Sequence, residues 1–140
     1  MRMRWSGWAL LALLFVACGS SVRSEDTRMY DRDVSGAEVL TRERFGVELP
    51  SNPSTGYQWR LAEPLEEEFV TLVGSDYQES DSDAVGAGGT ETWVFRAVGQ
   101  GTTTIRLEYV RAWEENPVPA DTWRLTIHVR RGSVSCSASS

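Results

Sequence analysis

The sequence contains no lysine, one histidine and two cysteines, and its shortage of basic residues and of histidine excludes two classes of protein. All 14 basic residues are arginines, they form no cluster, and they are outnumbered by 20 acidic residues. A chain with a formal charge of −6 is unsuited to nucleic acids and to anionic membrane surfaces. The only imidazole, His128, falls at an outward position of a predicted strand, so it cannot complete a catalytic triad at a loop. We therefore expect neither an enzyme nor a bound cofactor.

Long hydrophobic runs are also missing. The longest, over residues 8–16, is too short to span a bilayer, which takes about 20 residues. Arg2 and Arg4 precede this run and small residues follow it, which is the order of a secretory signal peptide. We predict a signal peptide over residues 1–17. Its removal would take the formal charge from −6 to −8, because it holds two arginines and no acids.

The end of the predicted signal peptide offers two processing routes. Phe15-Val16-Ala17-Cys18 resembles a bacterial lipobox, although leucine is usual where Phe15 stands. Lipidation of Cys18 would anchor the protein in the bacterial cell envelope, in the periplasm or outer membrane, with the lipid as its only membrane contact. Ordinary cleavage after Gly19 is the alternative, because Ala17-Cys18-Gly19 also fits the small-x-small rule, and it would give a secreted protein.

The remaining chain divides into three parts. Residues 18–34 are polar without periodicity and are predicted to be a tether, and residues 35–131 are predicted to form one domain. Residues 132–140 are serine-rich and predicted to be a disordered tail. Cys136 lies in that tail. Its pairing with Cys18 is disfavoured because either processing route uses or removes Cys18.

Apolar residues alternate with polar ones along most of residues 35–131, which is the period of a β-strand. Strong alternation covers residues 45–49, 57–61, 93–97, 105–109 and 123–129, and weaker strands are predicted near 35–40 and 69–73. No convincing helical stripe is present. Seven to eight short strands predict an all-β, immunoglobulin-like sandwich, with a hairpin turn at residues 98–101. The inner faces should hold Trp59, Phe95, Leu107 and Leu125.

The unusual residues fall in three connections, which contain residues 51–56, 86–89 and 111–117. Because consecutive antiparallel strands reverse direction, these connections should emerge at one end of the sandwich. Taken singly, the asparagine, proline and glycine of the first are turn signals. The glycines of the second lack the helix and lysine of a phosphate loop. Trp113 lies between charged residues at a strand end, so it is predicted to be exposed.

Together the three segments resemble the chagasin family of cysteine protease inhibitors. That family carries, in order, Asn-Pro-Thr-Thr-Gly-Tyr or -Phe, Gly-x-Gly-Gly and Arg-Pro-Trp. The matching residues here are Asn52-Pro53-Ser54-Thr55-Gly56-Tyr57, Gly86-Ala87-Gly88-Gly89 and Arg111-Ala112-Trp113. Ser54 stands for the first threonine and Ala112 for the proline. The second departure puts the stiffness of the third loop in doubt, because proline restricts a loop before it binds.

The resemblance implies a monomeric, reversible inhibitor of papain-like cysteine proteases. It implies that the first loop covers the catalytic cysteine while the other two grip the cleft walls, with Trp113 as a main contact. The other hypothesis is a non-inhibitory envelope lipoprotein that binds another partner through the same loops. A calcium site among the acids of residues 76–83 is disfavoured, because their order lacks the calcium-loop pattern. The sequence does not name the target protease.

Overall fold

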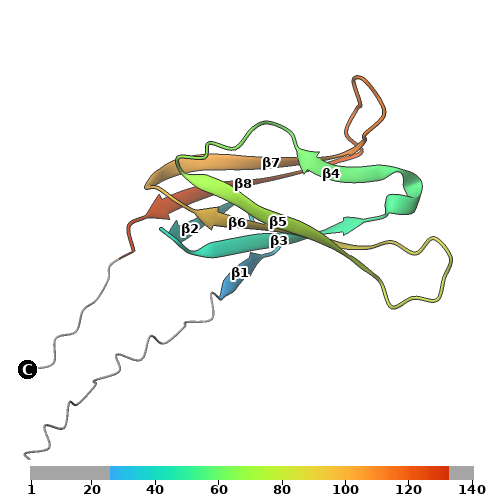
Figure 1. Ribbon diagram of the computed structural model, residues 1–140, viewed down its shortest axis with the longest axis horizontal. Coiled ribbons are helices and arrows are strands. Elements are labelled where there is room, and N and C mark those ends of the chain that lie inside the picture. Colours follow the sequence, from blue (N-terminus) through green and yellow to red (C-terminus); the bar gives the residue numbers. More distant parts are fainter. Residues whose placement is uncertain (1–25, 133–140) are drawn as a thin grey trace, which may run out of the picture.

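The computed structural model describes residues 26–132; the predicted signal peptide, Cys18 and Cys136 lie outside them. Eight strands form two four-stranded sheets that pack face to face (Figure 1). The elements are β1 (Thr27–Tyr30), β2 (Gly36–Leu40), β3 (Arg44–Ser51), the 3₁₀ turn η1 (Pro53–Thr55), β4 (Tyr57–Leu61), β5 (Val70–Glu79), β6 (Gly89–Ala97), β7 (Gly101–Arg111) and β8 (Asp121–Arg130). Within the described residues, no helix is long and apolar enough to cross a membrane.

The strand order is β1-β3-β6-β5 in one sheet and β2-β8-β7-β4 in the other. The pairs are antiparallel except for one at an edge of each sheet, β1 with β3 and β2 with β8, which are parallel. The result is the predicted immunoglobulin-like sandwich. Its core forms from the inward residue of each alternating pair. Trp59, Phe95, Leu107 and Leu125 are all at most 4% exposed, which confirms the predicted core.

The domain begins earlier than the sequence indicated. Residues 27–30, assigned to the tether, form β1 and pair with residues 44–47 of β3. Tyr30 packs edge-on against Phe45, with ring centroids 6.3 Å apart. A four-residue edge strand that turns one aromatic side chain toward the core carries almost no alternation. The polar composition of this segment therefore hid the strand.

The predicted hairpin turn at residues 98–101 was wrong. The turn joins β6 to β7, which belong to different sheets, so it crosses the sandwich rather than closing a hairpin. Gly99 is needed for close approach: a Cβ there would lie 2.3 Å from the carbonyl oxygen of Glu68. The strand predicted near 69–73 is also longer, because β5 runs to Glu79 through a bulge between Leu72 and Gly74 that breaks the alternation.

The β3–β4, β5–β6 and β7–β8 connections all leave one end of the sandwich, as predicted, and we call this end the loop end (Figure 1). The opposite end, which we call the base, holds the connections over residues 41–43, 62–69 and 98–100. The described chain also enters and leaves at the base, because Thr27 pairs beside Arg44 and β8 ends at Arg130 beside Leu40. The loop end is therefore clear of both ends of the described chain.

Candidate functional site

The first loop is a closed turn held by its own polar groups. Asn52 caps η1: its Oδ1 accepts from the backbone N of Ser54 at 3.2 Å and from Ser54 Oγ at 2.6 Å. Thr55 donates its backbone N and Oγ1 to the carbonyl of Asn52, at 3.1 and 2.7 Å. Pro53 fits the first position of the turn, and Gly56 ends it with φ at +79°. Ser54 thus supplies a hydroxyl that donates to the capping oxygen of Asn52, at the position where the family motif has threonine.

Asn52 also joins this loop to its neighbours. Its backbone N donates to the hydroxyl of Tyr109 on β7 at 2.8 Å, which links the loop to the other sheet. Its side-chain Nδ2 donates to the carbonyl of Gly86 in the second loop at 2.9 Å. The sequence identified Asn52 as a turn residue and as part of the first motif, but not as the side chain that joins two loops.

The second loop joins β5 to β6 and lies directly against the first. A Cβ at Gly88 would lie 2.8 Å from the carbonyl oxygen of Ser51, and one at Gly89 would lie 2.0 Å from that of Gln78. These two glycines are therefore required by close backbone contact. Gly86 is different, since its φ is +79° but no atom lies within 4 Å of its Cβ position. Val85 beside it is fully exposed.

The third loop starts with a turn at Arg111-Ala112-Trp113-Glu114, closed by a bond of 3.2 Å from the Glu114 N to the Arg111 carbonyl. Trp113 is 67% exposed, as predicted. Its indole nevertheless rests on the first loop, because a Cβ at Gly56 would lie 2.0 Å from Trp113 Cη2. Position 56 therefore requires glycine for two reasons: its φ is left-handed, and the indole of Trp113 leaves no room for a Cβ. The indole of Trp113 is therefore exposed to solvent but held in place by its contact with Gly56.

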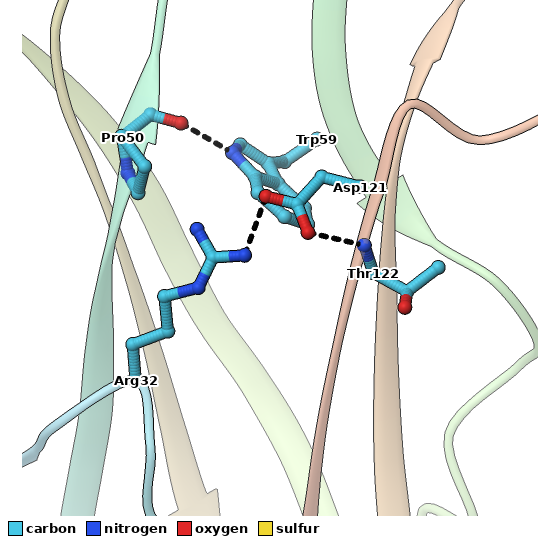
Figure 2. A network of polar contacts seen from close by, with 5 residues as sticks. All are labelled: Arg32, Pro50, Trp59, Asp121 and Thr122. Atoms are coloured by element: carbon cyan, nitrogen blue, oxygen red, sulfur yellow. Dashed lines mark hydrogen bonds and ion pairs between the residues drawn. The ribbon is translucent and has the colours of Figure 1, made fainter.

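An aromatic stack lies beneath the three loops. Tyr57 stacks on Tyr109 with centroids 5.3 Å apart, and the Arg111 guanidinium lies 4.7 Å from the Tyr57 ring centroid. Trp59 lies beyond Tyr109, at 5.1 Å. Its indole Nε1 donates to the carbonyl of Pro50 at 2.9 Å, which joins β4 of one sheet to β3 of the other (Figure 2).

A second cross-link, also drawn in Figure 2, lies beside the third loop. Arg32, in the turn after β1, pairs with the carboxylate of Asp121 at the start of β8. The same carboxylate accepts from the backbone N of Thr122 at 2.8 Å. The Trp59 hydrogen bond links β4 to β3, and this ion pair links the turn after β1 to β8. Both contacts therefore connect the two sheets just below the loops.

The structure brings the three motifs together at the loop end, and it adds residues that sequence reasoning missed. Tyr109 connects the first loop to the aromatic stack, although in the sequence it was one more alternating strand residue. Val85 and Val118 are exposed valines, by 106% and 84%, in the second and third loops. A valine set among glycine, alanine or proline in a predicted loop was the available signal for both.

The side chains exposed at the loop end are of the kind that bind a partner. His128 is exposed near the base, where its Nδ1 lies 2.9 Å from Thr102 Oγ1, far from the loop end. Within residues 26–132, no three histidine, cysteine or acidic side chains converge as metal ligands would. Stiff turns, an exposed indole and exposed valines instead offer a preformed contact area for a protein partner.

The comparisons with known proteins agree with this geometry. Chagasin of Trypanosoma cruzi is 33% identical over 95 residues, which cover 66% of this chain and 84% of that protein. Amoebiasin-2 of Entamoeba histolytica is 29% identical over 84 residues, covering 60% of this chain and 68% of that protein. The solved cysteine protease inhibitor EhICP2 from Entamoeba histolytica superposes with a TM-score of 0.64 at 22% identity, covering 74% of this chain and 96% of that one.

A further solved structure, that of PbICP-C in complex with falcipain-2, superposes with a TM-score of 0.52 at 16% identity and covers 75% of this chain and 90% of that one. At this identity it shows a shared fold. The sequence profile described as "Chagasin family peptidase inhibitor I42" matches residues 38–127, a span that includes all three loop motifs. The chain therefore belongs to the chagasin family of peptidase inhibitors.

Proposed function

We propose that this protein inhibits papain-like cysteine proteases reversibly, by placing its three loops in the active-site cleft. Its family consists of cysteine protease inhibitors and not of enzymes. The observation that carries the proposal is the cross-linking of the three motif loops into one rigid wedge. Asn52 joins the first loop to the second, and Trp113 seats the third on Gly56 of the first.

A wedge of this kind resists cleavage because of its backbone shape. A protease aligns an extended strand across its catalytic residues, whereas the first loop is a 3₁₀ turn that ends in a left-handed glycine. Because the hydrogen bonds of Asn52 already order the loop, little conformational entropy is lost on binding. No covalent step with the protease is needed. The family motif implies that the first loop covers the catalytic cysteine while the other two contact the cleft walls.

The test is an inhibition assay with the chain from residue 19 onward, which contains every described strand. We expect sub-micromolar, reversible inhibition of at least one enzyme in a panel of papain-like proteases, or about 8 kcal/mol of binding free energy. Absence of inhibition throughout the panel at tens of micromolar would contradict the proposal. A pull-down with the same protein would then identify the partner of a non-inhibitory binding module, the alternative function.

We also propose that Cys18 is lipidated and holds the domain at the bacterial cell envelope. The support is the Phe15-Val16-Ala17-Cys18 sequence, together with the entry of the described chain at the base, where an anchor leaves the loops accessible. Cys18→Ala should move the protein from the membrane fraction to the soluble fraction and abolish labelling by a fatty-acid analogue. An unacylated wild-type protein in mass spectrometry would favour cleavage after Gly19 instead.

A further inference from the structure

A groove of about 660 Å³ opens between the two sheets, immediately beneath the loops. It lies where the sandwich is open at one side, between the edge strands β4 and β5. Four wedge residues line it: Pro53 and Gly56 from the first loop and Ala112 and Trp113 from the third. A protein that covers the wedge therefore also covers the mouth of this groove.

A fixed carboxylate lies inside the groove. Glu91 of β6 is half-buried, and its Oε2 accepts from Ser51 Oγ at 3.1 Å while its Oε1 accepts from Trp93 Nε1 at 3.0 Å. Each carboxylate oxygen accepts more than one hydrogen bond, so capacity remains on both. No lysine, arginine or histidine is among the residues that line the groove.

Aromatic side chains make up much of the remaining wall, namely Tyr57, Trp59, Tyr77 and Trp93. Aromatic rings attract cations, and arginine most often. The molecule already uses this attraction once, where Arg111 lies over Tyr57. A carboxylate held in a recess with low-dielectric walls acts more strongly on a cation than the same group on an open surface.

We propose that this groove receives an arginine or lysine side chain from the protease, next to the cleft that the wedge fills. The inference rests on the proposed function, because the wedge and the groove share their rim. Arginine suits the site better than lysine, since its planar guanidinium can bond to Glu91 while it stacks on an aromatic ring. The groove then selects among proteases by the charge beside their active site, independently of the wedge.

The first experiment tests the groove without any protease. N-acetyl-arginine-N-methylamide is titrated into the chain from residue 19 onward, with its uncharged citrulline analogue as the matched probe. The quantity measured is the NMR chemical shift of the Trp93 indole N–H, because this group donates to Glu91. The indole N–H of Trp123, which lies in the core, serves as the reference. We expect a saturable shift of the Trp93 signal with the arginine probe alone, and its loss in Glu91→Gln. Equal shifts with both probes, or none up to about 50 mM, would overturn the proposal.

The second experiment measures inhibition of the most sensitive protease of the panel. Glu91→Gln removes the charge but keeps a side chain that can bond to Ser51 and Trp93, and its melting temperature confirms the fold. We expect the inhibition constant to rise about tenfold, with a weaker salt dependence. Glu67→Gln, an exposed acid of the base connection over residues 62–69, removes the same charge and should change the inhibition constant less than about twofold.

The two experiments separate the possible failures. If the wild-type protein inhibits no protease, the proposed function fails, and the titration still judges cation binding in the groove. If it inhibits but Glu91→Gln inhibits equally well, the proposed function stands and the protease does not place a cation in the groove. A shift in the titration without any effect on inhibition also overturns the assignment to the protease.

Discussion

The connections at the two ends of the sandwich are joined to one another by different kinds of contact. At the base, the connections are tied by backbone groups: Arg42 N donates to the Ala97 carbonyl at 2.8 Å, Ala97 N to that of Glu43 at 3.0 Å, and Val98 N to that of Phe69 at 2.7 Å. At the loop end, the ties are side chains, chiefly those of Asn52 and Trp113. Almost any sequence supplies backbone bonds, whereas the loop-end ties depend on residue identity.

This difference explains why the three family motifs lie at the same end of the described domain. The motif residues of the loop end build the shape that is presented to a partner, and they also form its outer surface. Changes at this end should therefore alter binding more than folding, while changes in the layer below should do the reverse. Trp59 and Trp113 test this division best, because they are the same residue type. Trp113 belongs to the surface of the loop end, and Trp59 belongs to the buried layer beneath it.

The largest effect is expected for Trp59→Ala. Trp59 is 4% exposed and bonds across the two sheets to Pro50, so its loss leaves a cavity and an unpaired carbonyl. We expect the free energy of unfolding to fall by about 3–5 kcal/mol in urea denaturation. Trp59→Phe keeps most of the volume and should cost less. An unchanged denaturation midpoint for Trp59→Ala would show that the layer beneath the loops does not support the fold.

Trp113→Ala should have the opposite signature. Because the indole is 67% exposed, we expect the free energy of unfolding to change by less than about 1 kcal/mol. The inhibition constant should rise by a factor equivalent to about 2 kcal/mol, mainly through faster dissociation. Surface plasmon resonance and thermal melting measure the two quantities. If the variant melts far below the wild type and binds normally when folded, Trp113 is a core residue.

Gly56→Ala and Gly86→Ala form a matched pair. Both glycines have φ at +79°, so alanine should cost each loop about 1 kcal/mol of backbone strain. Only at Gly56 would the new methyl group also collide with Trp113. We expect weaker inhibition from Gly56→Ala than from Gly86→Ala, with a change in tryptophan fluorescence in Gly56→Ala alone. Equal effects would mean that Trp113 does not rest on Gly56.

The smallest effect, a gain, is expected for Ala112→Pro. Ala112 occupies the second position of the turn that closes from Glu114 to Arg111, where proline is favoured. Stiffening that turn should strengthen inhibition by about 0.4–1 kcal/mol, or two- to fivefold. Association and dissociation rates would show whether the gain is in binding. Weaker inhibition would indicate that the turn must adjust when it meets the protease.

The sequence predicted what depends on local pattern. Alternation identified the strong strands and the core around Trp59 and Phe95, and strand reversal placed three connections at one end. It missed β1, where only one of four residues faces the core, and it misassigned the turn at residues 98–100, because a glycine-rich turn has the same local composition within a sheet or between sheets. Contacts such as Asn52 with Gly86, 34 residues apart, follow from the fold and not from turn propensity.

The parallel pairing of β1 with β3 determines how the domain responds to force. The described chain enters at the base, and β1 runs from there toward the loop end beside residues 44–47. A pull on the entering chain, against a partner held at the loops, therefore acts along the strand axis. The bonds between β1 and β3 then carry the load together in shear, instead of opening one after another as they would in an unzipping geometry. When a protease bound at the loop end is pulled away from the base, the whole length of β1 would therefore bear the force.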